Sequence, residues 1–300
     1  MIRNLCVFID GTMQDRSPEE AATDSNVVCL YNSSPDVDAG DIQQRCYYRK
    51  GVGTRSHESI TGGALGFGLD ERITEAKMWL DDECDMARED GCQPRLYLFG
   101  FSRGAFAVRV LATFLKRDIE FLGVWDTVKA TPGNDFGISE LPPYVKHACH
   151  AMAIDEHRSI FDVFRFNPAD RLSERWFSGS HTDVGGGYRK RELADITLRW
   201  MAKQAVDHGL IVNRERLNLD APVDLTMEPE IHNEDNGGWG ITNVFKSRKW
   251  TIQRVIGVTD ALDDTVLYIR DHWRDLISND LLAKNQHFIG GGHIDNDTIA

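Results

Sequence analysis

Apolar residues gather in short runs along the chain, and the stretches between several of these runs repeat apolar positions at helical spacing. The short runs predict β-strands, at Asn4–Ile9, Arg45–Arg49, Leu96–Phe99, Glu120–Trp125 and Glu174–Phe177. The periodic stretches predict helices, at Glu71–Asp90, Arg103–Lys116 and Leu193–His208. Strands that alternate with helices indicate an α/β fold, with a mostly parallel sheet that helices cover on both faces.

The pattern weakens after about residue 210. Residues 231–240 are rich in glycine and asparagine, and Trp250–Val258 is a further strand candidate. We expect a single domain over residues 1–300. Its core would cover about residues 3–210. Residues 211–300 would form a C-terminal extension that packs on the core and shapes the mouth of the site.

The segment Leu96–Lys116, LYLFGFSRGAFAVRVLATFLK, places a serine between two glycines where an apolar strand becomes a helix. Gly100 and Gly104 flank Ser102 in a G-x-S-x-G pattern, which is typical of the nucleophile elbow of α/β-hydrolases. The glycines suit a close approach of neighbouring backbone, and the serine would occupy a strained conformation above the helix N-terminus. The alternative is a serine N-cap on a tightly packed helix.

Polar residues also follow other predicted strands. Asp126 follows Glu120–Trp125, and His181 lies just past Glu174–Phe177. Since reactive groups gather at the carboxyl ends of parallel strands, these side chains would lie near Ser102. Serine, acid and histidine occur here in the chain order of α/β-hydrolases, which predicts a catalytic triad. The histidine would take the serine proton as the serine attacks an ester carbonyl, the aspartate would orient the imidazole, and water would hydrolyse the acyl-enzyme.

The first predicted strand ends in VFIDGT, which places Asp10, Gly11 and Thr12 at the same edge of the sheet. We expect the oxyanion to accept the N–H of Arg103, the residue after the nucleophile, and a second N–H from Gly11 or Thr12. Asp10 would order this loop by accepting backbone N–H groups. A strand followed by DGT also occurs in phosphotransferases, but these need an aspartate two residues earlier, where this chain has Phe8.

Two further residues compete for the catalytic roles. Asp183 would hydrogen-bond the Gly185–Gly187 turn or a neighbouring strand end, and it is the second candidate for the triad acid. His157, in DEHR, is the competing base, and we predict that it lies on a helix among charged neighbours. His181 and Asp183 form an H-x-D pattern that suits a metal ion, but no third ligand is evident nearby. We therefore predict no metal site and no cofactor.

Composition sets wider limits on function. The chain is 41% hydrophobic and 27% charged, and 34 Lys and Arg against 47 Asp and Glu give a formal net charge of −13. This charge offers nucleic acid no general attraction, so we predict no nucleic-acid partner. No apolar stretch approaches the ~20 residues of a membrane span, and the N-terminal run is too short for a signal peptide. Dispersed cysteines without a C-x-x-C pair suit reduced thiols and synthesis in the cytoplasm.

Seven motifs occur in order along the chain: VFIDGT, GVGT, GGALGFGLD, LFGFSRGAFAVR, FLGVWDTV, DEHR and WFSGSHTDVGGGY. Over roughly residues 3–210 they resemble the α/β-hydrolase catalytic domain of type VI secretion phospholipase effectors and its uncharacterised bacterial and fungal relatives. The resemblance implies a serine lipase or esterase, with phospholipase A activity toward membrane lipids in the best-known members. It places the nucleophile on Ser102, the acid on Asp126 and the base on His181.

The chain departs from the family pattern at two places. Thr182 stands where the family usually has serine, and Ile231–Glu234 differs from the usual I-H-D-S-type stretch. The resemblance implies an ester or phospholipid substrate, a secretion-system or immunity-type protein partner, and export by a signal-independent route. The alternative functions are a small soluble-ester esterase, and a catalytically silent binding or regulatory module of the same fold.

Overall fold

The structure is a computed structural model, and it describes residues 1–11, 24–51, 64–130, 136–225, 228–232, 254–257 and 260–272. Within these ranges, the strands form a seven-stranded sheet in the order β2-β3-β1-β4-β5-β6-β7. Neighbouring strands pair in parallel, except for the antiparallel β2–β3 pair. The strands are β1 (Ile2–Ile9), β2 (Val37–Ala39), β3 (Ile42–Arg49), β4 (Gln93–Phe101), β5 (Ile119–Trp125), β6 (Val145–Ala153) and β7 (Leu172–Phe177).

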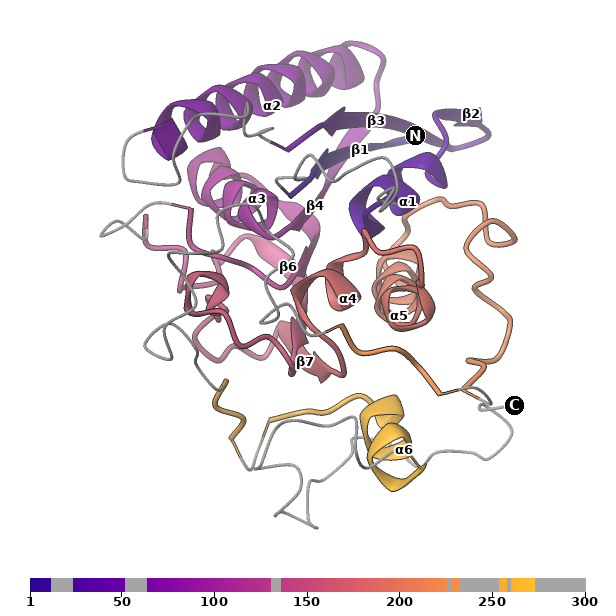
Figure 1. Ribbon diagram of the computed structural model, residues 1–300. Coiled ribbons are helices and arrows are strands. Elements are labelled where there is room, and N and C mark those ends of the chain that lie inside the picture. The colour runs from indigo at the N-terminus through magenta and orange to yellow at the C-terminus, as the bar shows by residue number, and fades with distance from the viewer. Residues whose placement is uncertain are drawn as a thin grey trace.

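Helices cover both faces of this sheet (Figure 1). On one face lie α2 (Ala64–Glu89) and α3 (Arg103–Leu115). On the other face lie α1 (Asn26–Asn32), α4 (His181–Gly185) and α5 (Glu192–Asp207). The predicted fold class, an α/β fold with a mostly parallel sheet and helices on both faces, is therefore confirmed.

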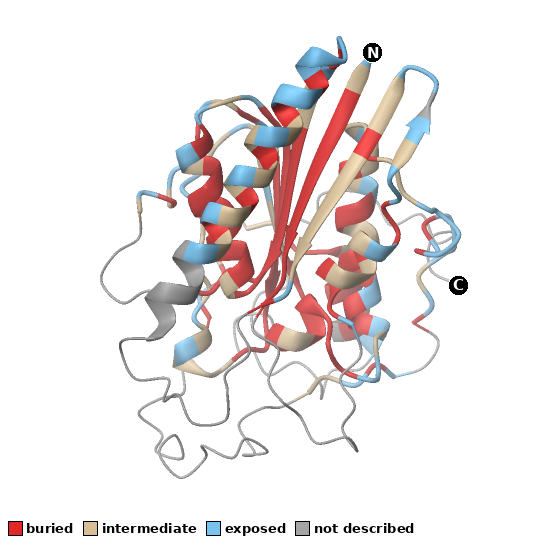
Figure 2. Cartoon of the chain, turned by 90° about the horizontal axis from the view of Figure 1, so that it is seen from above, coloured by how far each residue is buried: buried red, intermediate tan, exposed pale blue. Residues whose placement is uncertain are grey.

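Alternate side chains of the strands build the core on the two sides of the sheet. In β1, Leu5, Val7 and Ile9 join the cluster formed with α2 and α3, whereas Cys6 and Phe8 join the cluster formed with α1 and α5. All five side chains are fully buried. A parallel sheet that is covered on both faces needs such continuous apolar strands. In Figure 2 the buried residues follow the strands between the two helical layers.

The sequence pattern did not predict β6. Its sequence, VKHACHAMA, contains lysine, histidine and alanine, which are not typical strand formers. The strand nevertheless lies inside the sheet, between β5 and β7. Its fully buried His150 has partners on both ring nitrogens: Nδ1 lies 2.9 Å from a carboxylate oxygen of Glu174, and Nε2 accepts the N–H of Thr127 at 3.2 Å. These contacts satisfy a polar side chain that burial would otherwise penalise.

Two further predictions differ from the structure. Helix α2 begins at Ala64, seven residues before the predicted start at Glu71. The strand predicted at Trp250–Val258 is wrong within its described part, because Arg254–Gly257 has no regular secondary structure. Its apolar pattern has another origin: Ile256 is buried in a side-chain cluster beside β7 and pairs with no strand.

The C-terminal part of the described chain lies along β7, the outer strand (Figure 1). The N–H of Trp176 donates to the carbonyl of Ala261, and the N–H of Asp263 donates to the carbonyl of Trp176. Leu262 forms an isolated parallel bridge with Trp176, and α6 (Asp264–His272) follows. These described residues thus pack on the sheet. The division of residues 1–300 into one core and one extension stays a prediction.

A close backbone contact joins the start of α3 to the end of β1. A Cβ atom added to Gly104 would lie 2.2 Å from the carbonyl oxygen of Ile9 and 2.4 Å from that of Asp10. Real Cβ atoms do not approach backbone at these distances, so any side chain here would push α3 away from the sheet.

We predict that Gly104→Ala lowers the free energy of unfolding by about 3 kcal/mol or more, because the displaced atoms are backbone in a packed core. The matched control is Gly91→Ala. Gly91 has a φ of +71 with nothing within 4 Å of an added Cβ, so only the backbone penalty of about 1–2 kcal/mol applies. Urea unfolding of the two variants gives the difference. Equal losses would mean that the β1–α3 contact relaxes easily.

Candidate active site

Ser102 stands at the turn between β4 and α3. Its backbone has φ 59 and ψ −123, a conformation that residues other than glycine rarely adopt. A Cβ atom on Gly100 would lie 2.5 Å from the carbonyl oxygen of Gly104, so this turn cannot form with a side chain at position 100. Because α3 begins at Arg103, the serine lies at the N-terminus of that helix. The tight strand-to-helix bend predicted from G-x-S-x-G is present.

Asp126 directly follows β5 and is fully buried. Its φ of 38 lies in the left-handed region, which is uncommon for a residue with a side chain. Its N–H donates to the carbonyl of Ala151 at 2.7 Å, and its Oδ1 accepts the N–H of Ala153 at 2.9 Å. The end of β6 therefore holds the backbone of this aspartate and one oxygen of its carboxylate.

His181 is the first residue of α4, a few residues beyond the end of β7. A capping box holds this helix start, because Asp183 Oδ2 accepts the N–H of Ser180 at 2.9 Å. The N–H of His181 donates to a carboxylate oxygen of Glu156 at 3.3 Å. The short helix thus presents the imidazole at the same sheet edge as Ser102.

One chain of hydrogen bonds joins the three side chains. The imidazole Nε2 of His181 lies 2.8 Å from Ser102 Oγ, and its Nδ1 lies 2.6 Å from Asp126 Oδ2. An ionised carboxylate only accepts, so Nδ1 carries the proton and Nε2 is the acceptor for the serine hydroxyl. The structure therefore brings the predicted serine, acid and histidine together in a geometry that suits proton transfer from Ser102 to His181.

The surroundings of His181 favour the neutral imidazole. Burial lowers the pKa of His181 from its ordinary 6.5, although the hydrogen bond and charge of Asp126 and the charge of Glu156 act in the opposite direction. The cation of Arg158 also lowers this pKa. The rings of Phe101 and Phe161 lie with their centroids 4.6 and 4.8 Å from the imidazole. An imidazole in this setting is unprotonated at neutral pH and can act as a base.

Arg254, from the C-terminal part of the chain, makes a bidentate ion pair with Asp126. Its Nη1 lies 2.6 Å from Oδ1 and its Nη2 lies 2.9 Å from Oδ2, and neither side chain is exposed. Burial alone would raise the pKa of Asp126, but the charge of Arg254 and the hydrogen bond from His181 outweigh it and hold this pKa well below its usual range. The sequence analysis missed Arg254, because no motif surrounds it.

The two residues that compete for the catalytic roles, Asp183 and His157, differ from what the sequence predicted. The carboxylate of Asp183 accepts the backbone N–H of His232 at 3.0 Å and lies 2.7 Å from its ring Nδ1, besides capping α4. Among the hydrogen bonds of the described residues, this carboxylate has none to the Gly185–Gly187 turn and none to the ring of His181. The helix predicted at His157 is wrong, because the chain there has no helical structure before Ser159.

The predicted oxyanion donors are only partly described. Arg103 is the first residue of α3, where no carbonyl of the same helix can accept its N–H. The N–H of Gly11 already donates to Asp10 Oδ1 at 2.7 Å, which conflicts with its predicted role as a donor. Asp10 also accepts the hydroxyls of Ser25 and Tyr48, and its role in ordering the loop stays a prediction. Thr12 lies outside the described residues.

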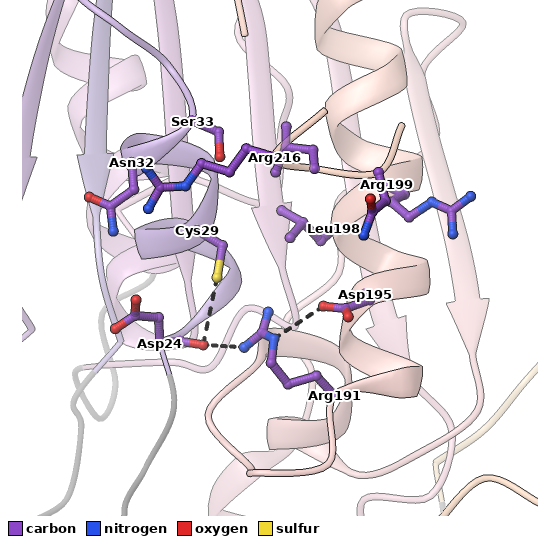
Figure 3. Close-up of a pocket in the computed structure, with 11 residues that line it drawn as sticks. Asp24, Cys29, Asn32, Ser33, Arg191, Asp195, Leu198, Arg199 and Arg216 are labelled. Carbon is purple, nitrogen blue, oxygen red and sulfur yellow. Dashed lines mark hydrogen bonds and ion pairs between the residues drawn. The ribbon is translucent and has the colours of Figure 1, made fainter. Parts of the chain in front are cut away.

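Other features of the described chain lie apart from this site. Among the described residues, no group of His, Cys, Asp and Glu could hold a metal ion, and no helix is long and apolar enough to cross a membrane. A cavity of about 240 Å³ lies between α1 and α5, and Figure 3 shows the side chains that line it. Arg191 in its wall pairs with Asp195, and Arg199 donates to the carbonyls of Ala221 and Pro222. These guanidinium groups already have acceptors.

The sheet, its helical layers and the serine turn define an α/β-hydrolase-like protein. The family model for the catalytic domain of type VI secretion (T6SS) Tle1-like phospholipase effectors matches residues 3–117 and 115–204. The chain belongs to this family of phospholipase effectors, as its motifs indicated.

The individual relatives share low sequence identity with this chain and are longer than it. The chain is 31% identical over 130 residues to the uncharacterized protein YEL023C of Saccharomyces cerevisiae, an alignment that covers 38% of this chain and 17% of the yeast protein. A crystal structure of an uncharacterized protein from Pseudomonas aeruginosa is 21% identical, with a TM-score of 0.48, over 72% of this chain and 47% of that one. A Tle1 effector bound to the VgrG spike of the type 6 secretion system is 20% identical, with a TM-score of 0.47, over 63% and 52%. The chain spans about half of these two solved relatives.

We expect the imidazole of His181 to titrate below pH 6.5, because its burial disfavours the charged form more than Asp126 and Glu156 favour it. The unfolded chain then binds this proton at a higher pH than the folded chain, so the contribution of His181 to stability falls as the pH drops below 6.5. An NMR titration of the histidine resonances, with His181→Asn for assignment, measures this pKa. A value above 6.5 would show that the two carboxylates outweigh burial.

Proposed function

We propose that the protein is a serine hydrolase that cleaves carboxylic esters, with lipid acyl esters as its substrates. Membership of the phospholipase effector family supports lipid ester hydrolysis in general. The single observation that carries the finer proposal is the hydrogen-bond chain from Ser102 through His181 to Asp126, with links of 2.8 and 2.6 Å. A merely structural histidine needs no strained serine at a helix N-terminus.

In the proposed reaction, His181 Nε2 takes the hydroxyl proton as Ser102 Oγ attacks the ester carbonyl carbon. The carbonyl oxygen becomes an oxyanion, which the N–H of Arg103 stabilises at the start of α3. The tetrahedral intermediate collapses, the ester C–O bond breaks, and His181 gives its proton to the leaving alcohol. Water, activated by the same imidazole, then releases the fatty acid and restores Ser102. Asp126 holds the imidazole in the tautomer that this sequence requires.

Apolar side chains beside the imidazole support an acyl substrate. The rings of Phe101 and Phe161 both lie against His181, so the group that reaches the serine meets aromatic surface. An acyl chain gains free energy on such a surface in proportion to the apolar area that leaves water. A phospholipid acyl ester fits both this surface and the family. Export by a type VI secretion system, with a secretion-system protein as partner, is part of the same proposal and rests on the family alone.

We predict that Ser102→Ala, Asp126→Asn and His181→Ala each lower turnover of a phospholipid acyl ester by about 10⁴-fold, because the three act as a unit. Labelling of the purified protein with a fluorophosphonate probe tests the serine directly, and the label should disappear in Ser102→Ala. Release of fatty acid from phospholipid vesicles then tests the substrate class.

Asp183→Asn is the matched control for Asp126→Asn, because it makes the same chemical change in a second buried carboxylate near His181. We expect it to slow turnover by no more than about tenfold, through the cap of α4 alone. A loss as large as that of Asp126→Asn would assign the acid role to Asp183. Full fluorophosphonate labelling of Ser102→Ala would overturn the proposed nucleophile.

A further inference from the structure

Arg254 reaches the far side of the carboxylate that faces His181. Besides its two bonds to Asp126, it donates to the carbonyl oxygens of Ala153 and Phe161, at 2.6 and 2.5 Å. Its side chain is wholly buried, and Arg254 lies 128 positions after Asp126 in the sequence. An arginine is costly to bury, and two of its four acceptors are the carboxylate oxygens of one residue of the proposed site.

We propose that Arg254 is a positioning residue of the active site. It holds the Asp126 carboxylate in the orientation that accepts the hydrogen bond from the Nδ1–H of His181. The inference rests on the proposed function and adds to it a residue from outside the family match, which ends at position 204. The rigid fork of a guanidinium suits this role, because it binds both oxygens of a carboxylate at once.

The contacts of Asp126 show what the arginine adds. Among the described residues, Oδ1 without Arg254 would keep only the N–H of Ala153, and Oδ2 would keep only the imidazole of His181. The terminal torsion of an aspartate is broad, so two single contacts leave the carboxylate free to tilt. A tilted carboxylate moves the imidazole, and misplacement of a catalytic group by about 1 Å can cost 10²-fold in rate.

The arginine also has an electrostatic effect on His181. A cation bound to Asp126 opposes part of the attraction between this carboxylate and an imidazolium. Removing the cation would therefore favour the charged imidazole and raise the pKa of His181. The other charged groups that influence this ring, Glu156 and Arg158, stay in place and oppose each other. The activity would then fall away at a higher pH than in the wild type.

The chain that carries Arg254 is held on the outer strand. Asp260 pairs with Arg165 at 2.9 Å and accepts the indole N–H of Trp176 at 3.0 Å, while its carboxylate also accepts the N–H of Gly257. These bonds lie three to six residues from Arg254 along the chain. Docking of the C-terminal residues on β7 thus delivers the guanidinium to the proposed site.

The test compares Arg254→Met, Arg254→Lys and the control Arg175→Met. Arg175 binds Asp263 at 3.3 Å, so the control removes the same charge from the attachment of the same C-terminal residues without touching Asp126. The readout is the rate of fluorophosphonate labelling against pH. We expect Arg254→Met to slow labelling by about 10²-fold. On the acid side of the pH–rate profile, the limb along which the rate falls (the acid limb) should move up by roughly one pH unit. Arg175→Met should keep the rate within about threefold and the limb unmoved.

Arg254→Lys keeps the charge but not the two-pronged guanidinium. Its acid limb should therefore stay near that of the wild type, while its labelling rate should lie between those of the wild type and Arg254→Met. It also carries the test if circular dichroism shows that Arg254→Met does not fold. The inference is overturned if a folded Arg254 variant keeps both the rate and the limb, or if Arg175→Met moves the limb equally. Failure of the proposed function gives a different result, because the wild type would then take up no label or Ser102→Ala would take up as much.

Discussion

The buried charge of Asp126 is the constraint on which the arrangement of the site depends. A carboxylate at zero exposure costs several kcal/mol unless ion pairs and hydrogen bonds compensate it. The compensation here comes from the end of β6, the start of α4 and Arg254 near the C-terminus of the described chain. The same two oxygen atoms of Asp126 thereby join the end of a strand, a short capped helix and a segment that is distant in the sequence.

The parts of the fold that follow local rules could be predicted from the sequence. Gly100 is needed by a close backbone contact with Gly104, four residues later, so the motif itself encodes this part of the turn. Ser102, Asp126 and His181 each follow a strand, and parallel strands bring their carboxyl ends to one edge. Chain order and strand ends therefore predicted that these three residues lie at one edge of the sheet, although neither reveals which acid faces the imidazole.

Features that depend on distant contacts could not be predicted in this way. Strand β6 has a composition poor in strand formers, and its place between β5 and β7 follows from pairing on both sides. The contact of Asp183 with His232 spans 49 positions of the chain, whereas the sequence suggested a contact with the glycine turn beside Asp183. Arg254 lies among residues without periodicity, and an arginine in such a stretch gives no sign that its partner is a carboxylate 128 positions earlier.

The backbone of Ser102 also limits how this position can change over evolutionary time. At φ 59 and ψ −123, a side chain branched at Cβ crowds the neighbouring peptide groups, whereas an unbranched one is tolerated. Threonine, the other residue with an aliphatic hydroxyl, is therefore a poor replacement here. A replacement that keeps a nucleophilic atom at this turn must therefore be unbranched at Cβ, as cysteine and aspartate are, whereas glycine or alanine would keep the turn but lose the chemistry.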